Sequence, residues 1–355
     1  MNVLTKIIGD EIRERGVISF ARFMDMALYH PEHGYYEREM SPGKRGDFYT
    51  SVSVGSLFGE LLGFQFAEWL AGLPEGMPPQ IVEAGAHDGQ LAKDVLACFR
   101  EHHPRLFGHV RYLIAEPSSA RRDRQKKHLG ELADNVTWIT DPAELKHRHF
   151  NGIIFSNELL DAMPVHRFGW DAAKKKWFEW GVGVEAGRFA WQKIWDTTFR
   201  TSHPELDAVL PDGYVVEVSS AAKKWWHEAA ESLERGWLMA IDYGMTMEEA
   251  FSPARKNGTL RAYLRHQVSH DVLDNVGEQD VTAHVNFSTI KKVGEDSGLF
   301  TEFFGTQSKF LTDILARVAK SHSLNGWDSN RTRQFQTLTH PEHLGRTFRV
   351  LVQSR

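Results

Sequence analysis

Three acidic residues end apolar runs that have the composition of buried strands. Glu83 ends "IVE", Glu116 ends "RYLIAE" and Asp242 ends "GWLMAID". An acid in this position can accept hydrogen bonds from a bound amine or hydroxyl, and the paired oxygens of a carboxylate match the vicinal diol of a ribose. For Glu116, a structural carboxylate that caps a helix starting near Ser118 is an equally good interpretation.

The segment Ile81–Leu96, "IVEAGAHDGQLAKDVL", predicts a strand, a tight turn and a helix. Gly85 and Gly89 let a ligand approach the backbone, while the turn amides and the helix N-terminus favour a carboxylate. Together with Glu83, the turn suits a ligand that carries both an amine and a carboxylate. The dinucleotide fingerprint G-x-G-x-x-G is absent, so S-adenosylmethionine fits better than a dinucleotide. A glycine turn that only solves a packing problem is the alternative.

A second polar group follows the fourth apolar run, where "SNELLDAMP" gathers Asn157, Glu158 and Asp161. Two acids this close can hold a cationic substrate, orient a guanidinium through paired hydrogen bonds, or accept a proton. The alternative is a helix N-terminus lined with acids, which the helix dipole also favours. Upstream, Asp47, Thr50 and Ser51 lie in an aromatic loop, either as hairpin surface residues or as a lid over a ligand.

The elements that must position these residues alternate between strand and helix patterns. After Ile81, apolar runs recur in "RYLIAEP", "NVTWIT", "GIIFSNELLDAMPV" and "GWLMAIDYG", which predicts a doubly wound α/β fold. Two C-terminal segments add strands, the last of them inserted antiparallel at the sheet edge. We therefore expect a mostly parallel sheet of seven strands.

Other segments predict parts outside this sheet. Residues 1–30 have the spacing of two packing helices, and a period-two pattern from Val165 to Val218 indicates an inserted antiparallel hairpin layer. We expect an N-terminal helical region with the aromatic lid loop over residues 1–78. The main domain then covers residues 79–355, with insertions at 165–218 and 245–290.

Composition excludes several classes of protein. The net charge of -5, from 42 basic and 47 acidic residues, gives no general attraction to nucleic acid or to an anionic membrane. Cys98 is the single cysteine, so no disulfide framework is possible and a reducing compartment is expected. Without a signal peptide pattern or a membrane-spanning run, the sequence predicts a cytoplasmic protein. The histidines between Arg261 and Phe287 match no zinc spacing, so we predict no metal.

Several segments together resemble the MidA family of bacterial and mitochondrial S-adenosylmethionine-dependent methyltransferases. They are "LYHPEHGYY", "GDFYTS", "FGELLG", "EAGAHDG", "SNELLDAMPVHRF", "IDYG", "GTLRAYLRHQ", "DVTAHVNF" and "LGRTFRVL". Most are unspecific alone, but their order is specific and they run nearly from end to end. The resemblance implies a Rossmann-like class I methyltransferase domain. Because the mitochondrial member is a complex I assembly factor that acts on a protein arginine, it also implies a protein substrate, with a respiratory complex I subunit as one candidate.

The resemblance also assigns roles to residues that match the family motifs. It implies cofactor contacts for Glu83, Gly85, Ala86, Gly89, Glu116, Asp47, Thr50 and Ser51. It places Asn157, Glu158 and Asp161 at the accepting nitrogen, with Glu158 orienting a guanidinium.

This chain departs from the family at two positions. The family turn reads E-x-G-x-G-x-G, and His87 stands where its second glycine is usual, so a side chain could narrow the methionine pocket. Asn286 replaces an acid near the substrate side. Two alternatives therefore stay open: a non-catalytic assembly or binding module in which His87 blocks the pocket, and a small-molecule methyltransferase.

Overall fold

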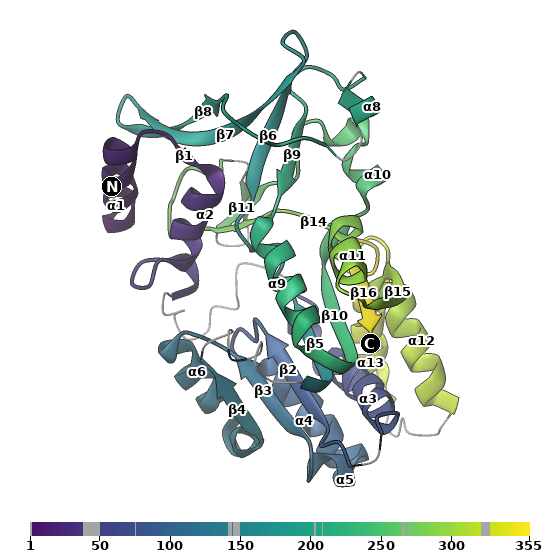
Figure 1. Ribbon diagram of the computed structural model, residues 1–355. Helices are drawn as coiled ribbons and strands as arrows, with labels where there is room; N and C mark the ends of the chain where they lie inside the picture. Colours follow the sequence, from purple (N-terminus) through teal and green to yellow (C-terminus); the bar gives the residue numbers. More distant parts are fainter. Residues whose placement is uncertain are drawn as a thin grey trace. The chain divides into compact units, whose positions relative to one another are not determined.

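The computed structural model describes residues 2–37, 50–74, 76–140, 144, 150–201, 204–207, 209–264, 267–269, 271–320 and 327–355. The chain divides into two compact units (Figure 1). The first unit combines Met1–Phe48, Asp161–Lys224 and Met245–Ser288, and the second combines Tyr49–Leu160, Trp225–Gly244 and Thr289–Arg355. Within the described ranges, every helix is too short or too polar to cross a bilayer.

The sheet that ends in the candidate residues has eight strands among the described residues. Seven form one path in the order β15, β16, β10, β5, β2, β3 and β4, and β14 lies off this path. The pairings from β10 through β5 and β2 to β3 and β4 are parallel, whereas β16 is antiparallel to both neighbours. The strands are β2 (Gln80–Ala84), β3 (Arg111–Ala115), β4 (Val136–Ile139), β5 (Phe150–Asn157), β10 (Leu233–Met245), β14 (Val285–Asn286), β15 (Phe300–Thr306) and β16 (Phe348–Ser354).

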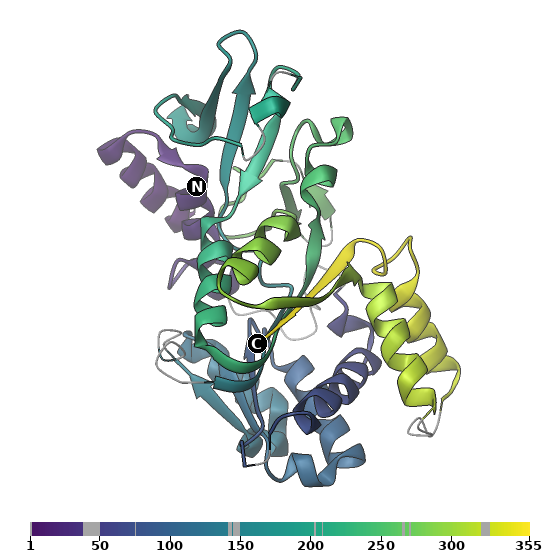
Figure 2. The same cartoon turned by 45° about the vertical axis from the view of Figure 1, so that its right-hand side comes forward.

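Two details of the sheet differ from the sequence prediction. The eighth strand, β14, has only two residues and therefore produces no apolar run. The last strand, β16, lies between β10 and β15 and not at the edge (Figure 2). Its consecutive residues Val350 and Leu351 are both fully buried, which requires cover on both faces of the strand, whereas Phe300 of the edge strand β15 is 76% exposed.

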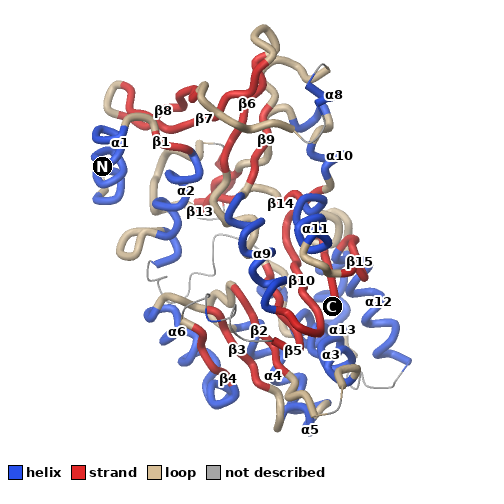
Figure 3. Tube along the Cα trace, viewed as in Figure 1, coloured by secondary structure: helices blue, strands red, loops and turns tan. Residues whose placement is uncertain are grey.

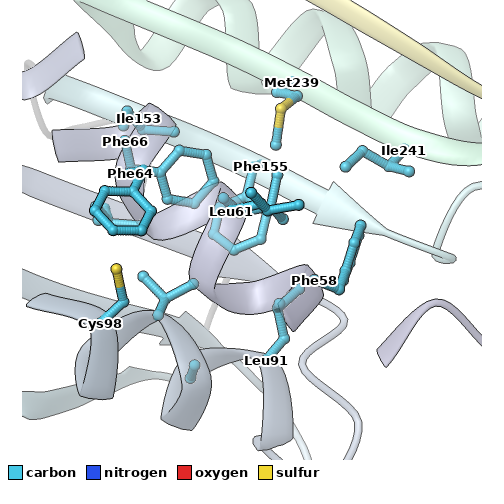
Figure 4. Close-up of a cluster of buried hydrophobic side chains, with 14 of the residues drawn as sticks. Phe58, Leu61, Phe64, Phe66, Leu91, Cys98, Ile153, Phe155, Met239 and Ile241 are labelled. Atoms are coloured by element: carbon cyan, nitrogen blue, oxygen red, sulfur yellow. The ribbon is translucent and has the colours of Figure 1, made fainter. Parts of the chain in front are cut away.

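Helix α3 (Leu57–Ala71) belongs to the second unit, although we predicted that the N-terminal region extends to residue 78. Twelve of its 15 residues are buried, because the helix is apolar on nearly all sides. Figure 4 shows its Phe58, Leu61 and Phe66 in the same cluster as Phe155 of β5. The N-terminal region predicted for residues 1–78 therefore contains a helix that packs in the core of the second unit.

The second unit contains further helices among the described residues. They are α4 (Gln90–His102), α5 (Pro104–Phe107), α6 (Ser119–Leu129), α12 (Gln307–Lys320) and α13 (Ser329–Thr339), with short 3-10 turns at Val52–Val54 and Gly130–Asn135. On α4, Cys98 is buried and its Sγ lies 3.4 Å from the Glu60 carbonyl oxygen; burial raises the pKa of its thiol. Cys98 is therefore a packing residue.

The first unit contains helices and two antiparallel sheets. Figure 3 shows its helices in blue and its strands in red. In the larger sheet the order is β1, β7, β6 and β9, with β8 paired to β7, and in the smaller one it is β12, β11 and β13. The strands are β1 (Ile18–Ser19), β6 (His166–Asp171), β7 (Lys176–Glu185), β8 (Arg188–Ile194), β9 (Val215–Val218), β11 (Arg261–Leu264), β12 (Gln267–Ser269) and β13 (Asp280–Thr282). The helices are α1 (Val3–Arg15), α2 (Phe20–Tyr29), α8 (Pro204–Asp207) and α10 (Met247–Ala250), with 3-10 turns at Tyr35–Glu37 and Pro253–Arg255. Helices α9 (Ser220–Ser232) and α11 (Phe287–Asp296) each contain a boundary between the units.

Candidate cofactor and substrate site

The predicted acids come together because their strands run parallel. The register pairs Ala84 of β2 with Ala115 of β3 and with Ser156 of β5, and it pairs Asn157 with Ile241 of β10. The residues that follow these positions therefore lie at one edge of the sheet, where the carboxyl ends of the strands meet. In open α/β sheets this edge is where ligands bind.

The turn after β2 is tight and left-handed at three positions. Gly85, His87 and Gly89 have φ values of 77°, 47° and 88°. The Gly89 amide donates to the Ala86 carbonyl at 2.7 Å, and Gly89 is the N-cap of α4. A Cβ on Gly85 would lie 3.0 Å from Leu159 Cδ1, so this position is both strained and crowded for any other residue.

The backbone of His87 explains why glycine is usual at this position in the family. A φ of 47° is left-handed, and a side chain there costs conformational energy. The imidazole is nevertheless 63% exposed, with Nδ1 3.7 Å from Asp88 Oδ1. Its side chain is therefore not packed inside the turn.

Glu83 is held inside the sheet. Its side chain is almost fully buried, and the Tyr112 hydroxyl donates to its Oε2 at 2.6 Å. Burial raises the pKa of Glu83 to about 7, because the charged form loses its hydration. Glu83, two residues before Gly85, is thus tied to the neighbouring strand β3 by a short hydrogen bond.

Glu116 follows β3 and already accepts hydrogen bonds from the protein. Its Oε1 accepts from the Ser118 amide at 3.0 Å and from Arg121 Nε at 2.8 Å, and its Oε2 accepts from Gln125 Nε2 at 3.3 Å. Glu116 therefore has the structural role considered above, since its carboxylate accepts a hydrogen bond from the backbone where α6 begins. These donors also orient both carboxylate oxygens.

Glu158 is the centre of a third polar group. Its backbone is left-handed, with a φ of 53°, and its amide donates to the Ile241 carbonyl at 2.9 Å. Its Oε1 accepts from Asn157 Nδ2 at 3.1 Å and from the Ser51 amide at 3.3 Å. The buried Ser51 hydroxyl in turn donates to Gln307 Oε1 at 3.0 Å. The structure thus brings Ser51, Asn157 and Glu158 together.

The other predicted residues have different places. Thr50 closes a small turn with Ser53, in which each hydroxyl accepts from the other residue's amide at 3.0 Å. Asp161 belongs to the first unit, where its carbonyl accepts from the Ala283 amide at 2.9 Å. Asp47, His266 and His270 lie outside the described residues.

Asp242 has a role that the sequence did not indicate beyond its place at a strand end. The side chain is fully buried, and its Oδ2 accepts from the amides of Leu159 at 3.1 Å and Leu160 at 2.8 Å. Its Oδ1 accepts from the Tyr243 amide at 2.8 Å. Asp242 therefore fixes the backbone directly after Glu158. Its only signal in the sequence was its place at the end of the apolar run "GWLMAID".

Two buried polar atoms at this edge have no hydrogen-bond partner within the described part of the chain. They are Ser156 Oγ and Asn157 Oδ1. Since buried polar atoms are nearly always satisfied, such atoms beside a ligand edge indicate a bound group. Together with the left-handed turn, the N-terminus of α4 and the acid after β3, they fit an amino acid conjugated to a nucleoside.

Comparison with known proteins agrees with a site for such a ligand. Residues 61–305 match the family model of an S-adenosyl-L-methionine-dependent methyltransferase. A candidate methyl transferase from Burkholderia thailandensis, bound to S-adenosyl-homocysteine, is 31% identical, covers 99% of this chain and 92% of that chain, and has a TM-score of 0.84.

Mitochondrial relatives also match. The Drosophila melanogaster protein arginine methyltransferase NDUFAF7 homolog is 25% identical over 98% of this chain and 84% of its own length. The Mus musculus protein arginine methyltransferase NDUFAF7 is 28% identical over 80% of this chain and 68% of its own length.

The fold and the site define an S-adenosylmethionine-dependent methyltransferase with a mostly parallel α/β sheet. Its cofactor is S-adenosylmethionine. Within this class, the chain belongs to the MidA family.

Proposed function

We propose that this protein methylates an arginine side chain of a protein substrate. The observation that carries the proposal is the Glu158 carboxylate, which Asn157 and Ser51 hold at the ligand edge of the sheet. A fixed carboxylate at this place suits a guanidinium, which presents paired N–H donors. The names of the mitochondrial relatives, which are protein arginine methyltransferases, support the same acceptor.

The cofactor is proposed to lie along the strand ends. Gly85, Ala86 and Gly89 would face the methionine part with Glu83 behind them, and Glu116 would hold the ribose hydroxyls. Thr50 and Ser51 would border the cofactor from the segment that precedes α3. When bound, S-adenosylmethionine supplies a methyl group on a positively charged sulfur.

The chain's own residues then have two tasks. Arginine is always protonated in water, so Glu158 would draw the positive charge to one side of the guanidinium and leave another nitrogen more nucleophilic. Asn157 Oδ1, which has no partner within the described residues, would accept an N–H of the acceptor group. Most of the rate enhancement would come from holding this nitrogen in line with the methyl group. As the nitrogen takes the methyl group it would lose a proton, which the Glu158 carboxylate would accept, and S-adenosyl-homocysteine would leave.

A labelling experiment tests the acceptor. The purified protein is incubated with methyl-labelled S-adenosylmethionine and with cell lysate fractions that contain protein, nucleic acid or small molecules. We expect label in protein, and methylarginine after acid hydrolysis of that protein. Label in another amino acid would contradict arginine, and label only in nucleic acid or small molecules would contradict a protein substrate.

A further inference from the structure

Gln125 on α6 is a fully buried polar side chain that connects two parts of the candidate site. Its Nε2 donates to the His87 carbonyl in the glycine turn at 3.0 Å, and to Glu116 Oε2 at 3.3 Å. Its Oε1 accepts from Trp138 Nε1 on β4 at 2.8 Å. The carbonyl and the carboxylate belong to turns that follow different strands, and this single amide contacts both.

The orientation of the Gln125 amide follows from the chemistry of its partners. An indole N–H can only donate, so the oxygen of the amide must face Trp138. The NH₂ group then faces His87 and Glu116, and its two hydrogens match these two acceptors. The reversed amide would place an oxygen against a carbonyl and a carboxylate, which is repulsive. Trp138 therefore determines which way Gln125 points.

From this geometry we infer that Gln125 is a positioning residue for cofactor binding. It sets the separation between the turn that would receive the methionine part and the acid that would receive the ribose. The hydrogen bond from Gln125 Nε2 also fixes the carbonyl of His87. It thereby stabilises the left-handed backbone of His87, a conformation that is unfavourable for a residue with a side chain. Arg121 holds the other oxygen of Glu116, so Gln125 completes the orientation of the carboxylate. The inference rests on the cofactor contacts proposed for Glu116.

The test is calorimetric binding of S-adenosyl-homocysteine to the full chain. In Gln125→Leu the turn and the acid lose their common donor, and we expect Kd to rise about tenfold or more. Trp138→Phe keeps Gln125 and the aromatic packing but removes the donor that orients the amide. For this variant we expect a rise of about threefold. Gln336→Leu, on an exposed position of α13, is the matched control and should leave Kd unchanged.

Adenosine serves as a second probe, because it contains the ribose but lacks the methionine part. We expect Gln125→Leu to weaken the binding of adenosine less than the binding of S-adenosyl-homocysteine. Adenosine would contact Glu116 but would not reach the glycine turn. A variant with a lower Tm but unchanged Kd for S-adenosyl-homocysteine well below that Tm would show that Gln125 is only structural. If Gln125→Leu does not fold, an unchanged Kd in Trp138→Phe overturns the inference.

Glu116→Gln separates this inference from the assignment on which it rests. If Glu116→Gln weakens S-adenosyl-homocysteine and Gln125→Leu does not, the positioning role of Gln125 is wrong and the ribose contact stands. If Glu116→Gln leaves Kd unchanged, the proposed contact of Glu116 is wrong, and the inference falls with it.

Discussion

Two turns at the ligand edge each contain a left-handed residue that is not glycine, and they use it differently. At His87 the φ is 47° and the side chain is 63% exposed. At Glu158 the φ is 53° and the carboxylate is hydrogen-bonded to Asn157 and Ser51. Under the proposed function, the backbone of the first turn would face the cofactor, whereas in the second turn the left-handed backbone presents a side chain to the substrate.

Different side chains hold the backbones of the two turns, one as a hydrogen-bond donor and one as an acceptor. Gln125 donates to the carbonyl of His87 from outside the turn. Asp242 accepts from the amides of Leu159 and Leu160, directly after Glu158. Strain at a functional site persists only where its surroundings over-determine it. We therefore predict that the histidine side chain is dispensable for methyl transfer and that the glutamate side chain is required.

The largest loss of stability from one substitution is expected when the second turn loses the acceptor of its backbone amides. In Asp242→Ala the buried amides of Leu159 and Leu160 lose their acceptor, so the free energy of unfolding should fall by about 3 kcal/mol. Chemical denaturation measures this change. Asp212→Ala, in an exposed turn of the first unit, is the control. An Asp242→Ala protein as stable as the wild type would mean that Glu158 keeps its conformation without Asp242.

The free energy of unfolding should depend on pH through Glu83, which lies in β2 just before the first turn. Burial raises its pKa from 4.5 to about 7, so the folded state binds a proton that the unfolded state has lost. Stability from this group is present below about pH 4.5 and declines as the pH rises to about 7, by roughly 1.4 kcal/mol per pH unit. Glu83→Gln should remove this decline while keeping a partner for Tyr112. Parallel curves for both proteins in denaturation from pH 4.5 to 7 would contradict the buried, protonated state.

Two matched variants should have the smallest effect on stability. They also test most sharply the difference between the turns at His87 and Glu158. His87→Gly and Glu158→Gly each relieve a left-handed side chain, so each protein should stay within about 1 kcal/mol of the wild type. His87→Gly should bind S-adenosyl-homocysteine and transfer methyl at least as well as the wild type. Glu158→Gly should bind S-adenosyl-homocysteine and fail to transfer. Loss of binding in His87→Gly would show that the imidazole itself contacts the cofactor.

Local patterns were enough to locate the edge of the sheet but not the supports behind it. Glu83, Gly85, Asn157 and Glu158 were found because each lies at or just after the end of an apolar run, which is visible within a few residues. Gln307 was not found, because its partner Ser51 is 256 residues away in the chain.

Strand order and backbone conformation were equally hidden from the sequence. Nothing in "FRVLVQS" states that β16 lies inside the sheet, since that depends on what covers its second face. Likewise, the sequence of the glycine turn did not indicate that His87 has a left-handed backbone and an exposed imidazole. Both depend on packing between segments that are distant in the chain.

The central claim is that the Glu158 carboxylate orients the accepting nitrogen. The most direct measurement compares Glu158→Gln with Glu131→Gln, an exposed control in the same unit, for methyl transfer to protein and for S-adenosyl-homocysteine binding. We predict that Glu158→Gln binds with an unchanged Kd and transfers methyl about a hundredfold more slowly or worse. Transfer at the wild-type rate by Glu158→Gln would contradict the claim.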